Sequence, residues 1–393
     1  MQIDAEQNIQ KLSFAESFNQ LTKGQFPFAL WRLPHAAEFE CIVSGSPEQK
    51  INTDHLDELS SGFLIAPFEK GGQKQTLFIS ADFYCGLDNL KAQVPFELEN
   101  RFTQHIENQE FDAQSDGHTP SSTDEKSTFI ENVARAVEQI REGRFQKVVL
   151  SRQKRISAAD FDPIQHFELV CAKYPELFCS LVYLPSERAI WIGASPEVLI
   201  KKDADKTFET MALAGTQPAY DEAHNLIACA DALWRQKEIE EQALVCRYII
   251  NCFKKIRVRE YEEIGPRTVK AGNLLHLQTH FKVDAESINF PQIASVMLNL
   301  LHPTSAVCGM PKENALAFIN QYEPFDRSFY SGFLGPVHIN QKSQLFVNLR
   351  TMQYSKGEIC LFAGCGITVD SDPEKEWAET EMKFRTIMPA QKA

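Results

Sequence analysis

The chain has 393 residues, of which 43% are hydrophobic, so it can bury one large core or two closely joined lobes. Its net charge of −13, without a basic block, argues against nucleic acid or an anionic membrane surface as the main partner. The sequence starts without a signal-peptide pattern and has no apolar stretch of about 18 residues, so no membrane span is expected. Ten cysteines without a Cys-x-x-Cys pair predict a cytoplasmic protein with reduced thiols.

The first 127 residues contain predicted strands and a predicted linker but no catalytic constellation. Residues 62–68 and 75–80 are predicted to be strands, because apolar and β-branched side chains fill them between polar turns. Residues 110–127 are rich in Ser, Thr and Asp, contain a glycine and a proline, and are predicted to be a loop or linker. The chemistry is therefore expected downstream of this segment.

A predicted strand with one lysine follows a predicted helix. The helix is expected from Thr128, which opens a Thr-x-x-Glu capping box, to Gly143, which ends it. The strand covers residues 145–152 and places Lys147 on a face with apolar neighbours. Partial desolvation favours a neutral lysine that can act as a base, whereas a lysine that protects a sheet edge is about equally consistent with the pattern.

Glu197 follows a Ser-Pro kink in an apolar segment. Residues 181–184 and 189–200 are predicted to form a β-hairpin that carries this glutamate. An apolar setting raises the pKa of a carboxyl group and suits a general acid, but a turn-exposed glutamate is the commoner case. The strand predicted at 211–218 should end in a glycine turn, whose N–H groups either bind an anion or simply form a plain turn.

Two predicted helices carry acidic side chains that can meet. A helix over about residues 230–253 presents Glu241, and a C-terminal helix that begins with Ser-Asp-Pro presents Glu376, Glu379 and Lys383 on one face. Each face alone is more typical of a solvated, salt-bridged surface. Three carboxylates together would repel one another unless a hard cation binds them, which indicates Mg²⁺ completed by water and a substrate oxyanion.

Further downstream, a buried arginine and two glycines stand out. Arg350 lies in a predicted buried strand over residues 344–351, where a guanidinium needs a carboxylate from the protein or a ligand. Gly364 and Gly366 interrupt an apolar run, which lets another backbone or a ligand approach closely. The histidines near residues 276–280 lack a second ligand at metal spacing.

Several of these segments occur together, in the same order, in the chorismate-utilising enzymes. That family includes isochorismate synthase, salicylate synthase, anthranilate synthase component I and aminodeoxychorismate synthase component I. The resemblance covers about residues 125–390. The similar segments are KVVLSR at 147–152, GASPE at 193–197, LAGT at 213–216, KExxE at 237–241, HLxT at 276–279, FDRxxYxG at 325–332, AGxGI at 363–367 and SDPExEWxETxxK at 371–383.

The resemblance implies an α/β (α+β) fold in which two large, mostly antiparallel sheets pack together with helices outside. It implies a variable N-terminal part of the same fold at residues 1–120 and a chorismate-binding catalytic region at 125–390. Chorismate is then the expected substrate, Mg²⁺ the expected cofactor and a monomer the expected assembly, without nucleic acid or membrane partners.

Within the family, Lys147 and the HPTSAVxG loop at 302–309 resemble the isochorismate-forming members. The resemblance implies that Lys147 activates a water, that Glu197 protonates the departing C4 hydroxyl, and that Glu241 and Glu379, with Glu376, hold Mg²⁺. Substrate binding is expected from Arg350, Lys383, Gly215, Thr216, Gly364, Ala306 and His276.

Other activities within this resemblance stay open. Salicylate synthase is the close alternative, ammonia-dependent synthesis is disfavoured by Lys147, and a catalytically silent homologue would bind chorismate or a pathway partner. Gln242 is a departure from the resemblance, since many members of the family have a histidine at this position next to the expected metal ligand. Menaquinone, a siderophore and salicylate are equally open as the destination of the product.

Overall fold

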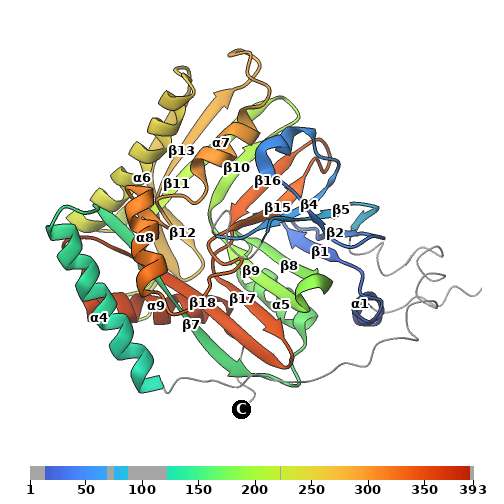
Figure 1. The fold of residues 1–393 in the computed structure, drawn as a ribbon, viewed down its shortest axis with the longest axis horizontal. Coiled ribbons are helices and arrows are strands. Elements are labelled where there is room, and N and C mark those ends of the chain that lie inside the picture. Colours follow the sequence, from blue (N-terminus) through green and yellow to red (C-terminus); the bar gives the residue numbers. More distant parts are fainter. Residues whose placement is uncertain (1–13, 69–74, 87–121, 222, 390–393) are drawn as a thin grey trace, which may run out of the picture.

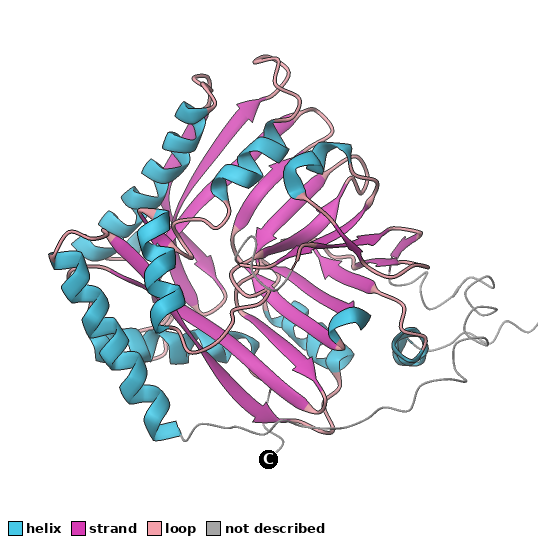
Figure 2. Ribbon diagram, viewed as in Figure 1, coloured by secondary structure: helices cyan, strands magenta, loops and turns pink. Residues whose placement is uncertain are grey.

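The computed structural model describes residues 14–68, 75–86, 122–221 and 223–389, and two nine-stranded sheets dominate it (Figures 1 and 2). Every strand pairing in them is antiparallel, which confirms the expected fold. Sheet 1 has the spatial order β14 (Gly309–Met310), β7 (Lys147–Ser157), β18 (Glu358–Ile367), β17 (Thr351–Ser355), β9 (Ala189–Ser195), β8 (Phe178–Leu184), β1 (Phe28–Arg32), β2 (Glu40–Val43) and β6 (Phe83–Gly86). Sheet 2 has the order β12 (Glu262–Ala271), β13 (Leu274–Asp284), β11 (Thr207–Pro218), β10 (Val198–Lys202), β16 (Ser343–Val347), β15 (Phe333–Val337), β4 (Gly62–Ala66), β5 (Leu77–Ser80) and β3 (Gln49–Lys50).

Helices cover the outer faces of both sheets (Figure 1). α6 and α7 pack on sheet 2, whereas α5 and α9 pack on sheet 1. The helices of the described chain are α1 (Phe14–Lys23), α4 (Ser122–Arg141), α5 (Pro163–Lys173), α6 (Gln236–Lys255), α7 (Ile293–Leu301), α8 (Lys312–Tyr322) and α9 (Pro373–Ile387), with short 3-10 turns η1 (Thr53–Glu58), η2 (Pro185–Glu187) and η3 (Cys229–Asp231).

The apolar core between the two sheets follows from the alternation of side chains along each strand. In β1, Ala29 and Trp31 point into the space between the sheets, while Phe28 packs on the helix side of sheet 1. The rings of Phe178 in β8 and Phe346 in β16 stack across that space with centroids 3.9 Å apart. Burial of these large rings holds the sheets face to face.

Two of the connections that cross between the sheets lie next to each other. β8 and β9 form the predicted hairpin, but β9 ends in sheet 1 and β10 begins in sheet 2, so the second strand of the hairpin does not continue to residue 200 as predicted. β16 ends in sheet 2 and β17 begins in sheet 1, so Arg350 lies in a connection and not in a strand. Because β9 pairs with β17 and β10 with β16, residues 196–197 and 348–350 lie side by side.

Two predicted helix starts are also wrong. α4 begins at Ser122, so Thr128 lies inside the helix and does not cap it. The polar start of this helix is attached to its surroundings by an ion pair of 2.9 Å between Lys126 and Glu374 of α9. Residues 110–121 of the predicted linker lie outside the described residues. α6 begins six residues after the predicted start, because η3 and an extended segment precede it.

The C-terminal helix begins as predicted. Asp372 is its N-cap and accepts hydrogen bonds from the backbone N–H groups of Glu374 and Lys375, and Pro373 occupies the first turn. Among the described helices, none is long and apolar enough to cross a membrane. The nine cysteines whose surroundings are described are free thiols.

Candidate active site

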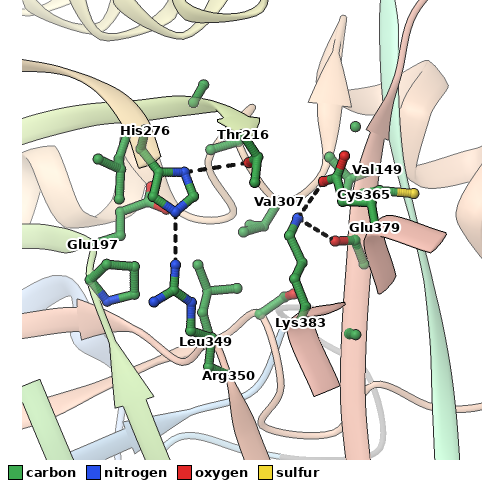
Figure 3. A pocket seen from close by; sticks show the side chains of 18 of the residues that line it. Val149, Glu197, Thr216, His276, Val307, Leu349, Arg350, Cys365, Glu379 and Lys383 are labelled. Carbon is green, nitrogen blue, oxygen red and sulfur yellow. Dashed lines mark hydrogen bonds and ion pairs between the residues drawn. The ribbon is translucent and has the colours of Figure 1, made fainter. Parts of the chain in front are cut away.

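A pocket lies beside the two crossings, between the sheets and α9 (Figure 3). All the predicted site residues except Lys147 and Glu376 line it. The lining residues among them are Glu197, Gly215, Thr216, Glu241, His276, Ala306, Arg350, Gly364, Glu379 and Lys383. Lys147 contacts the lining residue Glu241, and Glu376 lies one turn before Glu379 in α9. Residues far apart in the sequence are thus gathered as expected.

Arg350 is a buried cation without an acidic partner. Its Nη1 donates to the carbonyl oxygen of Ala271 at 3.0 Å, and its Nη2 donates to Nε2 of His276 at 2.7 Å (Figure 3). Among the described residues, no carboxylate lies within ion-pair distance of Arg350, and burial lowers its pKa to about 10. A buried guanidinium in this state favours a ligand carboxylate.

His276 orients Arg350 and is uncharged. Its Nδ1 lies 3.0 Å from the carbonyl oxygen of Gly215, so the ring donates there and accepts from Arg350 at Nε2. Burial, followed by the charge of Arg350, lowers the pKa of His276 well below its ordinary value. The histidine expected to bind substrate therefore also fixes the guanidinium.

A bulge at Gly215 creates this arrangement. The register of β11 against β13 shifts between Ala214 and Thr216, and Gly215 has a φ of +66°, which favours glycine. The predicted glycine turn is therefore wrong, because β11 continues through this position. The bulge directs the Gly215 carbonyl toward His276 and places Thr216 Oγ1 3.4 Å from the same ring nitrogen.

Glu197 is buried at the first crossing and faces the pocket (Figure 3). Its N–H donates to Ser195 Oγ at 3.3 Å, and its carbonyl accepts from the N–H of Val347 at 3.0 Å. Burial raises the pKa of the Glu197 carboxyl to about 8, although the charges of Lys147 and Lys383 act in the opposite direction. This carboxyl is therefore protonated at neutral pH and can donate a proton.

Lys147 is fully buried in β7 and forms an ion pair with Glu241 of α6, with 2.8 Å between Nζ and Oε1. β14 and β18 flank β7, so the alternative of a lysine at an open sheet edge is wrong. Gly366 of β18 makes room for the pair, because a Cβ there would lie 2.4 Å from Glu241 Oε1 and 2.9 Å from Lys147 Cε. The glycine-interrupted strand thus accommodates two side chains of the protein.

Each of the three acidic residues predicted to hold a metal is paired with a lysine. Glu241 pairs with Lys147, Glu379 with Lys383 at 2.8 Å, and Glu376 with Lys237. Burial lowers the pKa of Lys237, but Glu376, Glu241 and Glu379 together outweigh burial and hold that pKa above its ordinary value. The side chain of Lys237 therefore lies in the combined field of all three carboxylates.

These carboxylates fit a hard divalent cation by their chemistry. In the part of the chain that the structure describes, no three metal-binding side chains are already gathered around one point. Oε2 of Glu376 is nevertheless buried without a hydrogen-bond partner, and burial and the charge of Glu379 raise the pKa of Glu376. A cation would satisfy this oxygen and relieve the repulsion, and oxygen ligands are those that Mg²⁺ prefers.

Gln242 attaches α6 to sheet 2. Its side chain accepts from the N–H of Ala214 at 2.9 Å and donates to Thr279 Oγ1 at 3.0 Å. These bonds fix the helix turn that carries Glu241. Gln242 therefore sets the position of a candidate metal ligand through the backbone.

An ion pair that was not predicted holds two walls of the pocket. Arg327 is buried and paired with Glu323 at 2.5 Å, and its guanidinium donates to the carbonyl oxygens of Val149 at 2.7 Å and Val307 at 2.8 Å. Glu323 in turn accepts from the N–H of Ser151 at 2.7 Å. The FDRxxYxG motif contains Arg327, so the motif was a signal for this role.

We expect Arg327→Met to destabilise the protein by about 3–5 kcal/mol, because it leaves the Glu323 carboxylate buried and unpaired. Urea unfolding followed by intrinsic fluorescence measures the change. The double variant Glu323→Leu/Arg327→Met should recover part of the loss, since it removes both charges. A neutral surface substitution changes the free energy of unfolding by no more than about 0.5 kcal/mol. If the free energy of unfolding of Arg327→Met lies within this range of the parent value, the ion pair has no structural role.

The pocket between the two sheets thus combines a protonated carboxyl, a buried guanidinium and a carboxylate–lysine cluster. The model of the chorismate binding enzyme family matches residues 37–391. The chain belongs to this family of chorismate-utilising enzymes, which confirms the resemblance found in the sequence.

Several relatives of the chain are named isochorismate synthases. The chain is 32% identical to isochorismate synthase EntC of Escherichia coli strain K12 over 268 residues, 67% of each chain. It is 29% identical to isochorismate synthase DhbC of Bacillus subtilis strain 168 over 339 residues, 82% of each chain. The structure of MenF, the menaquinone-specific isochorismate synthase of Escherichia coli, superposes with a TM-score of 0.71 at 20% identity, covering 96% of this chain and 91% of that chain.

Proposed function

We propose that the protein is an isochorismate synthase, in which water adds to C2 of chorismate and the C4 hydroxyl leaves. The observation that carries the proposal is the combination of Glu197, a buried carboxyl with a pKa of about 8 that lines the pocket, and Lys147, a buried lysine that contacts the lining residue Glu241. An acid and a base on separate elements suit a reaction that adds a hydroxyl at one ring carbon and removes one at another. The names of the relatives support the same activity.

In this proposal Lys147, in its neutral form, takes a proton from the attacking water, and Glu197 gives its proton to the departing hydroxyl. The ring double bonds shift between the two carbons, one water enters and one leaves, and the product is an isomer of the substrate. Arg350, held by His276, binds one substrate carboxylate, and Lys383 adds positive charge beside it.

Glu241, Glu376 and Glu379 are the residues that we propose as Mg²⁺ ligands. When bound, the ion supplies positive charge that offsets the second substrate carboxylate and excludes the wrong ring orientation. The family membership supports this cofactor, and so do the chemistry and repulsion of the three carboxylates.

Product analysis tests the activity. Purified protein is incubated with chorismate and Mg²⁺, with and without ammonium or EDTA, and the products are separated by HPLC. We expect isochorismate alone, unaffected by ammonium and lost with EDTA. Salicylate with pyruvate, an amino product, or no product would each contradict the proposal.

The rate should fall on the alkaline side of about pH 8. Glu197 must be protonated to act as the acid, and the proton is lost as the pH rises through its raised pKa of about 8. We expect kcat at saturating chorismate and Mg²⁺ to drop about tenfold for each pH unit above this value. A flat profile from pH 7 to 10 would exclude Glu197 as the general acid.

A further inference from the structure

A second cavity lies on the opposite side of sheet 1 from the core between the sheets. It is bounded by α1, by the start of α5, by the η2 turn between β8 and β9, and by the turn between β17 and β18. Its volume of about 380 Å³ falls in the range of about 300–1,000 Å³ that is typical of small-molecule sites. None of its lining residues lines the candidate active site.

Aromatic rings supply the walls of this cavity. Phe161 and Tyr354 lie with ring centroids 5.0 Å apart, and Phe18 and Tyr183 are buried on the side of α1. The hydroxyl of Tyr183 donates to the backbone carbonyl of Thr22 at 3.2 Å, which attaches α1 to β8. Aromatic rings on two sides of one cavity favour a planar, aromatic ligand.

The charged residues that line the cavity are all cations. They are Lys23 at the end of α1, Arg188 in the turn after η2, and Lys356 in the turn after β17. Among the described lining residues there is no aspartate or glutamate, although the whole chain carries a net charge of −13. Burial raises the pKa of Tyr354, and the charge of the exposed Asp160 raises it further. Asp160 is therefore nearby, but it does not line the cavity.

We propose that this cavity is a second binding site, which takes a small aromatic carboxylate. The ring of the ligand lies between the aromatic walls, and its carboxylate meets the lysine and arginine side chains at the rim. The site is separate from the candidate active site and does not depend on the proposed reaction.

The position of the cavity connects it to the candidate active site through two strands. β9 and β17 pair with each other, and Ile190 and Tyr354 at one end of the pair face the cavity. At the other end, β9 leads to Glu197 and β17 starts directly after Arg350. Tyr354 lies four residues after Arg350, so the two sites are roughly 14 Å apart along this strand at about 3.4 Å per residue.

Calorimetric titration with sodium salicylate as the probe tests the proposal. The titration uses the full chain with Arg350→Gln, so that binding of the probe in the candidate active site is weakened. We expect saturable binding of one probe per chain. We expect cyclohexanecarboxylate and phenol, which lack the aromatic ring and the charge respectively, to bind at least about tenfold more weakly.

Matched charge variants locate the site. Lys23→Gln/Arg188→Asn/Lys356→Asn removes the three rim charges, and asparagine suits the positive φ of Arg188 and Lys356. Lys254→Gln/Lys255→Gln/Arg259→Gln removes the same charge from exposed positions elsewhere and serves as the control. The rim variant should bind salicylate at least about tenfold more weakly, and the control should bind as the parent does.

Three results would overturn the proposal. They are no saturable binding, equal binding by the rim and control variants, or equal affinity for cyclohexanecarboxylate. Both variants should keep the thermal midpoint of the parent protein, and in the Arg350 background they should differ only in probe binding. If the rim variant unfolds, Tyr354→Leu, which removes one aromatic wall, provides the second test and should weaken binding to a similar extent.

Discussion

Lys147→Gln should lower kcat for chorismate by about 10²- to 10⁴-fold, the usual contribution of a positioned base. The glutamine keeps a polar contact with Glu241 but cannot accept a proton from water. Because Lys147 is proposed to act on the attacking water and not to bind the substrate, chorismate should still bind. Steady-state kinetics measures turnover, and calorimetry with chorismate and Mg²⁺ measures binding.

Lys154→Gln is the matched control for this variant. Lys154 lies in the same strand, is partly exposed and pairs with Glu381 at 3.5 Å, away from the pocket. Its removal should change kcat less than twofold. If Lys147→Gln and Lys154→Gln both had the kcat of the parent protein, Lys147 would not be the base.

Glu241→Gln should weaken Mg²⁺ binding by far more than tenfold. Loss of a residue that only contacts a metal ligand typically lowers metal affinity by about 10- to 100-fold, and Glu241 is proposed to be a ligand itself. The substitution removes one of the three carboxylate charges and also leaves Lys147 buried without its acidic partner. Turnover should therefore fall together with Mg²⁺ affinity. Titration of Mg²⁺ into the protein by calorimetry measures the affinity directly, without substrate.

Glu240→Gln, one position earlier in α6, separates the metal site from general charge effects. Glu240 is exposed and accepts a hydrogen bond from Gln236 at 2.8 Å. It carries the same charge as Glu241 but faces solvent, so its variant should bind Mg²⁺ as the parent does. Equal Mg²⁺ affinity in the Glu241 and Glu240 variants would remove Glu241 from the metal site.

The gathering of the site residues was predictable because each lies in a motif with its own local signature. The Asp-Pro start of α9 fixed the face that carries Glu379 and Lys383, and the Ser-Pro kink marked Glu197. The double crossing between sheets was not predictable in the same way. A kink at Pro196 is consistent with a bend within one strand or a change of sheet, and long-range pairing decides between them.

Other features depend on contacts that local pattern does not encode. The role of Arg327 rests on backbone carbonyls of Val149 and Val307, which are 178 and 20 residues away in the sequence. The bulge at Gly215 depends on the register of β11 against β13. The pairing of Glu241 with Lys147 and of Glu376 with Lys237 requires β7, α6 and α9 to be placed together, whereas the pair of Glu379 and Lys383 follows from spacing within one helix.

The origin of the new hydroxyl tests the central claim most directly. Chorismate and Mg²⁺ are incubated with the protein in water enriched in ¹⁸O, and the product is examined by mass spectrometry and NMR. The account predicts one ¹⁸O atom at C2 of isochorismate and loss of the original C4 oxygen. A product without the label, or one that keeps the C4 oxygen, would contradict addition of water between Lys147 and Glu197.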